Sequence, residues 1–192
     1  MSPDNSNRNM YLRLQQLAAI LDRLAEASGR IIAWLTLAMV LVMFAVVLLR
    51  YLLQSGSIAL QESISYLHAA VFMLGAAYTL RHDGHVRVDI FYQKCSPLVR
   101  AWIDLLGTLL LLFPVCGFIF ASSLDYVSAS WAIHEGSREA GGLDGVFLLK
   151  TAIPAMALLL MLQGCSLLLH NLLVISGHPP APATDTGPDR EL

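Results

Sequence analysis

The side chains that could do chemistry are few, and most lie near the ends of long apolar runs. A di-haem cytochrome would need paired histidines that face each other at matched depth in the membrane. His68 lies in the outer half of one apolar run, whereas His170 lies near the inner end of another. The two depths do not match, so the sequence predicts no haem site and no bound cofactor of another kind.

The three cysteines Cys95, Cys116 and Cys165 form no Cys-x-x-Cys motif. Two of them lie inside apolar runs, where a free thiol behaves as a small hydrophobic side chain. A membrane disulfide oxidoreductase would need a reactive cysteine pair that faces the oxidising side. We therefore predict neither a disulfide nor a metal site.

Ion-coupled transport by these helices alone would need an acid deep within the membrane. The two acids of interest, Glu62 and Asp104, both lie near the ends of apolar runs. The spans are thus predicted to lack an ion or substrate pathway of their own, and we expect no enzyme activity.

Arg50 and Glu62 are the charges of greatest interest, because they lie at the outer ends of two consecutive apolar runs. Charges in membrane segments usually pair, so an ion pair across the short turn would set the register of the two helices. Contact with a partner protein at the outer surface is the alternative interpretation, and the sequence leaves both open.

A second polar cluster follows the second apolar run, with Arg81, His85, Arg87 and Asp89. Its basic residues favour an anchor near anionic lipid headgroups, or a surface that faces a larger partner. No second metal ligand is in evidence for His85, which disfavours a metal site. Asp89 is expected to pair with Arg87 or with a neighbouring chain.

The composition explains why the charges are confined to the ends of the runs. The chain of 192 residues is 56% hydrophobic and 14% charged, with a mean hydropathy of +0.62, which excludes an ordinary soluble domain. About 20 apolar residues are enough to cross a bilayer. The predicted fold is an all-α membrane protein with amphipathic or interfacial segments at the N-terminus and in the loops, and with four transmembrane helices at about 31–53, 58–80, 98–122 and 146–175.

Residues 1–30 are predicted to form an N-terminal segment with an amphipathic helix, outside the membrane domain of residues 31–175. Its apolar residues recur in steps of three and four, as in one helical stripe, at Met10, Leu14, Leu17, Leu21, Leu24 and Ile31. This helix is expected either to lie on the membrane surface or to pack on a partner or on its own bundle. Residues 176–192 are rich in Pro, Ala and Asp, which is typical of a disordered tail.

Two features within the runs predict how the helices pack. Pro114 is expected to kink the third span. Gln163 is placed near mid-depth of the fourth span, where an amide favours an interhelical hydrogen bond. Gly141 and Gly142 are expected to form the turn into that span, and Lys150 to extend its ammonium group to the interface.

The orientation follows from the distribution of basic residues. Nine Lys and Arg residues lie on the side of the two termini, and three, Arg50, Arg138 and Lys150, lie on the other side. Since basic residues are retained in the cytoplasm, both termini are predicted to be cytoplasmic.

In order and spacing, these features resemble the small membrane subunit (the Q, or DctQ-type, subunit) of tripartite ATP-independent periplasmic (TRAP) transporters. The likeness covers about residues 30–175. Its motifs are Arg50 and Tyr51, then Gln61, Glu62 and Tyr66, then Gly75, Ala76 and Ala77, then Arg81 with the run 84–89, then Gly141 and Gly142 within 139–143, and finally Lys150 and Pro154.

The resemblance implies a small scaffold subunit in the bacterial inner membrane. Its partners would be the large TRAP membrane subunit, which carries the sodium sites and the moving domain, a periplasmic substrate-binding protein that delivers an organic acid, and membrane lipids. It implies no nucleic-acid partner and no sodium site on this chain. A self-assembling tetraspan adaptor and a membrane redox protein are the alternatives.

Overall fold

The structure of the protein is a computed structural model that describes residues 4–85 and 92–178. Its described elements are all helical. In chain order they are α1 (Asp4–Leu52), α2 (Ile58–Arg81), α4 (Pro97–Gly107), the π-helical segment η1 (Thr108–Leu112), α5 (Phe113–Ala132) and α6 (Val146–Ile175).

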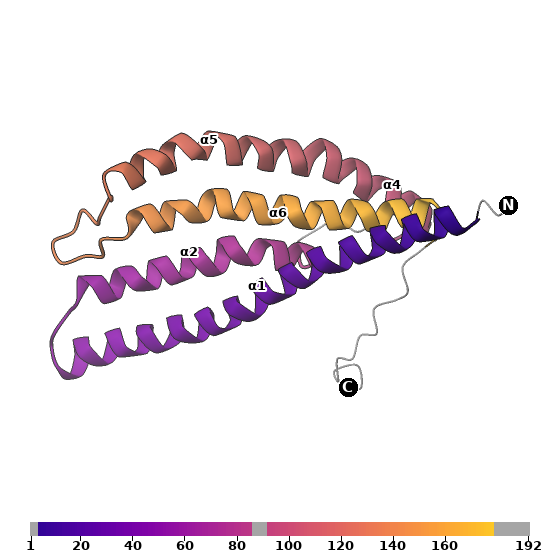
Figure 1. The fold of residues 1–192 in the computed structure, drawn as a ribbon. Coiled ribbons are helices and arrows are strands. Elements are labelled where there is room, and N and C mark those ends of the chain that lie inside the picture. Colours follow the sequence, from indigo (N-terminus) through magenta and orange to yellow (C-terminus); the bar gives the residue numbers. More distant parts are fainter. Residues whose placement is uncertain (1–3, 86–91, 179–192) are drawn as a thin grey trace, which may run out of the picture.

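The long helices lie side by side as a fan, in the order α5, α6, α2 and α1 (Figure 1). They converge where α1 begins and α6 ends, and they diverge toward the loop that joins α5 to α6. Four stretches within the described residues are long and apolar enough to span a membrane, in α1, in α2, along α4–η1–α5 and in α6. The predicted all-α membrane fold with four spans is confirmed.

The described part of the N-terminal segment belongs to the same helix as the first span, so α1 shows no break at the expected domain boundary near residue 30. Helix α1 continues through 49 residues without a break, a length of about 73 Å at 1.5 Å per residue. Gly29 is the residue most able to interrupt it, but the ring of Tyr78 on α2 occupies the place that a Cβ at Gly29 would take. The glycine therefore serves a close approach of two helices and does not end α1.

The first half of α1 packs on its own protein, which was one of the two expected arrangements. Its buried residues are Ala18 and Ala25, 0% and 3% exposed, whereas Leu17 and Leu24 of the predicted stripe are exposed. The small residues face α6 because they let two helix backbones approach closely. The larger apolar side chains are left on the outside of the fan.

Pro114 was expected to kink the third span. The structure has a π-helical turn, η1, just before this proline. In η1 the amide of Phe113 donates to the carbonyl of Thr108, five residues earlier. Pro114 has no amide hydrogen, and a π-turn adjusts the freed carbonyls around such a residue. Gly164 of α6 lies against this segment, and a Cβ there would come within 2.8 Å of Leu112.

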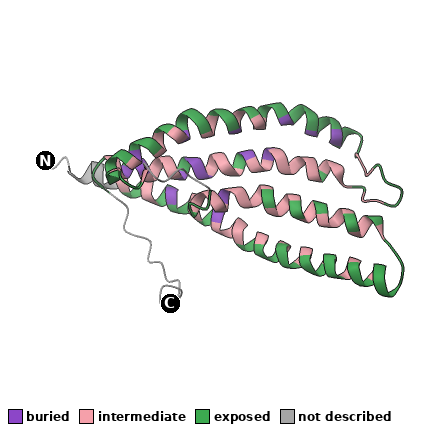
Figure 2. Ribbon diagram, turned by 180° about the vertical axis from the view of Figure 1, so that it is seen from behind, coloured by how far each residue is buried: buried purple, intermediate pink, exposed green. Residues whose placement is uncertain are grey.

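Buried residues lie where the helices converge, along α6 and in the half of α5 nearest the loop (Figure 2). The outer helices α1 and η1–α5 present large apolar side chains to the outside, including Trp34, Phe44, Leu111 and Phe118. Such faces suit lipid or partner contacts, because an apolar helix surface in a bilayer carries no solvation penalty.

Candidate functional site: polar clusters at the two ends of the fan

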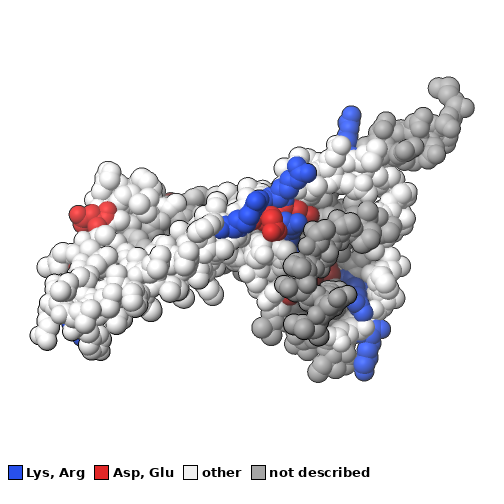
Figure 3. Space-filling view, turned by 90° about the horizontal axis from the view of Figure 1, so that it is seen from below, with Lys and Arg blue, Asp and Glu red and all other residues white. Residues whose placement is uncertain are grey.

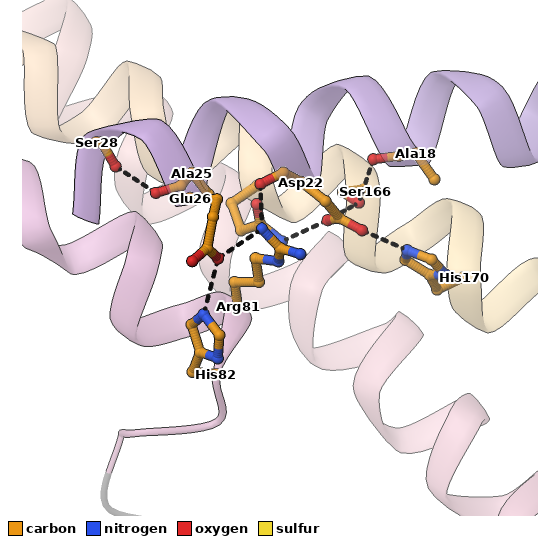
Figure 4. A network of polar contacts seen from close by, with 10 residues as sticks. Ala18, Asp22, Ala25, Glu26, Ser28, Arg81, His82, Ser166 and His170 are labelled. Carbon is orange, nitrogen blue, oxygen red and sulfur yellow. Dashed lines mark hydrogen bonds and ion pairs between the residues drawn. The ribbon is translucent and has the colours of Figure 1, made fainter. Parts of the chain in front are cut away.

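Polar side chains meet at the end of the fan where the helices converge, in a group that we call the termini-end network. Its members come from α1, α2 and α6, and they are Asp22, Glu26, Arg81, His82, Gln163, Ser166 and His170 (Figure 4).

Asp22 is the centre of this network, and its carboxylate meets three side chains of α6. The hydroxyl of Ser166 donates to Oδ1 over 2.6 Å, and Nε2 of Gln163 donates to the same oxygen over 3.2 Å. His170 Nε2 lies 3.0 Å from Oδ2. The three α6 residues are spaced by three and four, so one helical face carries them all. The hydrogen bond predicted for Gln163 is confirmed.

Glu26, one turn after Asp22, connects α1 to the last turn of α2. Its Oε2 lies 2.9 Å from Arg81 Nη1 and 3.2 Å from His82 Nε2. The same Arg81 nitrogen also donates to the backbone carbonyl of Asp22, and the ring of Tyr78 lies against His82 at a tilt of 46°, with the ring centroids 4.3 Å apart. Arg81, expected to be a surface anchor or a partner contact, is therefore used between two helices of this chain.

At the opposite end, the segment 133–145 between α5 and α6 is held by two carboxylates, in a group that we call the loop-end clamp. The first carboxylate is Glu62, in the second turn of α2. It accepts a hydrogen bond from the Ser137 hydroxyl and another, 2.7 Å long, from the backbone amide of Leu143. The Glu62 side chain thus joins an early part of the loop, at Ser137, to a late part, at Leu143.

The two consecutive glycines of the loop allow this closure, as the turn prediction required. Gly141 has φ +80°, in the left-handed region that favours glycine. At Gly142 a Cβ would lie 2.7 Å from Glu62 Oε2 and would also overlap the Ser137 side chain. Only a residue without a side chain lets the carboxylate reach the loop backbone.

The second carboxylate of the loop-end clamp is Glu135. Its Oε2 lies 2.5 Å from Lys150 Nζ and accepts the Ser130 hydroxyl over 2.7 Å. These hydrogen bonds, first from the Lys150 ammonium and then from Ser130, hold the pKa of Glu135 below its usual value. Lys150 also lies over the ring of Tyr126, 4.0 Å from its centroid, so its ammonium joins α5, α6 and the loop.

The expected ion pair between Arg50 and Glu62 is not what the structure shows. Both carboxylate oxygens of Glu62 are engaged by the loop, and Arg50 forms no ion pair with any described residue. The physical reason is geometric, since the loop brings two donors directly onto the carboxylate while the end of α1 stays at the edge of the fan.

The other predicted residues lie apart from these clusters. Tyr66 lines an apolar groove of about 420 Å³ between α2 and α6, with its hydroxyl buried. His85 lines a larger groove of about 750 Å³ between α1, α2 and α6. Arg87 and Asp89 lie outside the described residues, as does the predicted tail beyond residue 178. No group of three or more His, Cys, Asp or Glu within the described ranges could hold a metal.

Several contributors were not predicted from the sequence as site residues, among them Asp22, Glu26, His82, Glu135, Ser137 and Ser166. A signal for Asp22 was present in the spacing of Gln163, Ser166 and His170, which puts three polar groups on one face of an apolar helix. Such a face needs a polar partner on a neighbouring helix. No comparable signal marks Ser137, because its role depends on the path of the loop.

The two clusters can hold helices and a loop in place, and that is the chemistry their geometry offers. A search of curated proteins found no match to the chain. A family model does match it over residues 39–173, that of the DctQ component of tripartite ATP-independent periplasmic transporters. The matched range contains the whole loop-end clamp and the α2 and α6 parts of the termini-end network. The chain therefore belongs to the DctQ family and is a multi-pass membrane component of a TRAP transporter.

Proposed function

We propose that this chain is the small scaffold subunit of a sodium-coupled TRAP transporter for organic acids in a bacterial inner membrane. It stabilises the static part of the large membrane subunit, and its loop end helps to dock the periplasmic substrate-binding protein. Both termini are cytoplasmic, and sodium and substrate bind on the other components.

The main support for this proposal is that polar and apolar side chains occupy different parts of the molecule. The polar side chains of both clusters are engaged in contacts within the chain, whereas α1 and α5 expose large apolar side chains along their length. A fan with its polar groups turned to internal contacts suits a rigid support, and its open apolar faces suit a second membrane protein.

The docking role is supported by the loop-end clamp. Loops that meet a partner bind more tightly when they are ordered beforehand, because less conformational entropy is lost on binding. Glu62 and Glu135 order the loop 133–145 from both sides, while Arg138 and Glu139 between them stay exposed. These two charges are the proposed contact points for the binding protein.

Co-purification tests the scaffold role. A tagged chain expressed with its neighbouring genes should emerge in a stoichiometric complex with a larger multi-span membrane protein, and reconstituted uptake should need both chains and a sodium gradient. A homo-oligomer without a large partner would overturn the proposal in favour of a self-assembling adaptor. A haem or flavin absorbance band in the pure chain would overturn it in favour of a redox protein.

The docking role needs a separate measurement. Charge reversal at Arg138 and Glu139 together should weaken the affinity of the purified complex for the binding protein and leave complex assembly intact. Reversal at Lys94 and Asp83, an exposed base and an exposed acid at the other end of the fan, is the control. Equal loss of affinity in both variants would contradict docking at the loop end.

A further inference from the structure

Two arginines on α1 carry charge that the rest of the described chain does not neutralise. Arg23 and Arg30 are both exposed. They are seven residues apart, or two helical turns, so they share one face of α1 at an axial separation of about 10 Å. Neither forms an ion pair with any other residue within 4–85 and 92–178.

The acid that should neutralise them is held elsewhere. Glu26 lies three residues after Arg23 and four before Arg30, the two spacings at which helix side chains pair. Its carboxylate is instead bound by Arg81 and His82 of α2, as the side chains in Figure 4 show. Asp22, the next nearest acid, is bound by α6. Folding thus binds both acids to neighbouring helices and leaves Arg23 and Arg30 without an acidic partner in the described ranges.

Most of the basic side chains visible in Figure 3 lie in the half of the molecule nearer the termini, some of them beside acidic ones, and a groove begins there. It lies between α1, α2 and α6, and its volume is about 750 Å³. Gly29, the neighbour of Arg30, lines its more polar end together with Tyr78 and His85, and its apolar remainder includes Ala33 and Phe72. The groove therefore changes from polar to apolar along its length.

Trp34 indicates where the bilayer surface crosses the groove, between the polar end and the apolar remainder. It lies one turn beyond Arg30, is 73% exposed, and belongs to the first turn of the apolar part of α1, which starts at Ile31. Exposed indole rings prefer the boundary between headgroups and hydrocarbon. Arg30 and Arg23 then lie on the headgroup side of that boundary, and Ala33 and Phe72 face the hydrocarbon.

We propose that Arg23 and Arg30 bind the phosphate group of an anionic glycerophospholipid, one of whose acyl chains occupies the groove between α1, α2 and α6. The guanidinium group is suited to phosphate because it presents paired donors in one plane. Basic residues where a helix leaves the bilayer attract anionic lipids. A molecule with one anionic end and a long apolar remainder matches the positive face and the polarity of the groove together.

Lipid retention by the purified full-length chain tests this inference. The chain is equilibrated in micelles with equal amounts of phosphatidylglycerol and phosphatidylcholine, and the bound lipid is counted by native mass spectrometry. We expect preferential retention of phosphatidylglycerol. At about fivefold per arginine near an anionic surface, the double variant R23Q/R30Q should lose roughly thirtyfold in affinity. The single variants should each lose about fivefold.

Two further variants separate the headgroup from the acyl chain. Arg50→Gln is the matched control, because Arg50 is an exposed arginine of the same helix that has no ion-pair partner in the described ranges, and it should retain the lipid fully. Ala33→Leu places a larger side chain in the groove and should weaken retention of both lipids while the preference for phosphatidylglycerol stays.

Four results would overturn the inference. They are equal retention of the two lipids by the wild type, an equal loss in R50Q and R23Q/R30Q, displacement of the lipid by millimolar inorganic phosphate alone, and exclusion of the lipid when the chain is purified in its transporter complex. The last result would assign the arginines to a protein interface.

Discussion

The two ends of the fan are held by different means. At the termini end, side chains of α1, α2 and α6 bind one another directly through Asp22 and Glu26. At the loop end, Glu62 and Glu135 bind mainly to the loop 133–145 and to the first turns of α6. The helices converge at the first end and diverge at the second (Figure 1).

This difference indicates which of the two clusters determines how the helices are arranged. Bonds among α1, α2 and α6 fix the distance and rotation of these three helices, whereas Glu62 binds only the loop and Lys150 joins α6 to α5 and the loop. The termini-end network should therefore determine how the helices pack, and the loop-end clamp should determine how the outer loop is presented. Substitutions that disturb one function and leave the other intact test this division.

The largest effect is expected at Asp22. Asp22→Ala removes the acceptor for Ser166, Gln163 and His170, and the free energy of unfolding should fall by about 2 kcal/mol, since each interhelical hydrogen bond in a membrane protein contributes about 0.6 kcal/mol or more. Denaturation of the detergent-purified chain, followed by circular dichroism, measures it. Asp125→Ala is the control, because Asp125 is an exposed acid. Equal losses in both variants would contradict a special role for the network.

The next largest effect is expected at Glu62 and should appear in the loop. Glu62→Ala leaves the Ser137 hydroxyl and the Leu143 amide without their acceptor, so the loop should open more often. Limited proteolysis with trypsin, which cleaves after Arg138, should then be several times faster, with helix content unchanged. Glu139→Ala is a matched exposed acid on the same loop. If that variant is cut equally fast, the clamp assignment is wrong.

A smaller effect of the same kind is expected at Gly142. Gly142→Ala places a methyl group 2.7 Å from Glu62 Oε2, and relieving this overlap should cost about 1 kcal/mol. Trypsin cleavage should accelerate less than in the Glu62 variant. Gly56→Ala provides the control, because a Cβ at Gly56 meets nothing within 4 Å. An unchanged cleavage rate in the Gly142 variant would show that the loop tolerates the group.

Acid should loosen the loop end selectively. The lowered pKa of Glu135 means that its bonds to Lys150 and Ser130 contribute fully above the ordinary value of 4.5 and are lost as pH falls through the lowered pKa. The ring of Trp131 reports on this region, because its Nε1 donates to Thr151 over 2.9 Å. In a chain with Trp131 as its single tryptophan, fluorescence should change below pH 4.5. The change should be much smaller in Glu135→Gln, and an equal change in both would contradict the assignment.

The fold could be predicted from the sequence because the membrane leaves few choices. Runs of apolar residues long enough to cross a bilayer must become helices, since every backbone group needs a partner within the segment. The continuity of α1 through residue 30 could not be predicted, because Gly29 resembles a helix end until the Tyr78 ring is seen against it. Whether a glycine ends a helix or admits a neighbour depends on tertiary packing.

The site could be predicted only in part, and the reason is the same at both ends. Glu62, Gly141 and Gly142 were recognisable as special, but their partnership joins residues about 80 positions apart through the path of a loop. The spacing of Gln163, Ser166 and His170 indicated a polar face without indicating Asp22 as its partner. The type of a buried polar residue predicts that it needs an interaction partner. The packing of the helices determines which residue becomes that partner.

The smallest effect is expected at Arg50. It tests most directly whether the two ends of the fan are held by different means. Arg50→Gln should change the free energy of unfolding by less than about 0.5 kcal/mol, as for other exposed residues without a partner. Glu62→Arg alone should free the loop, and the swap R50E/E62R should be cleaved by trypsin as fast as E62R, since the donors that Glu62 needs belong to Ser137 and Leu143. Rescue in the double variant would show that α1 and α2 are joined by charge at the loop end. The loop end would then hold helices as the termini end does, and the division between the two clusters would fail.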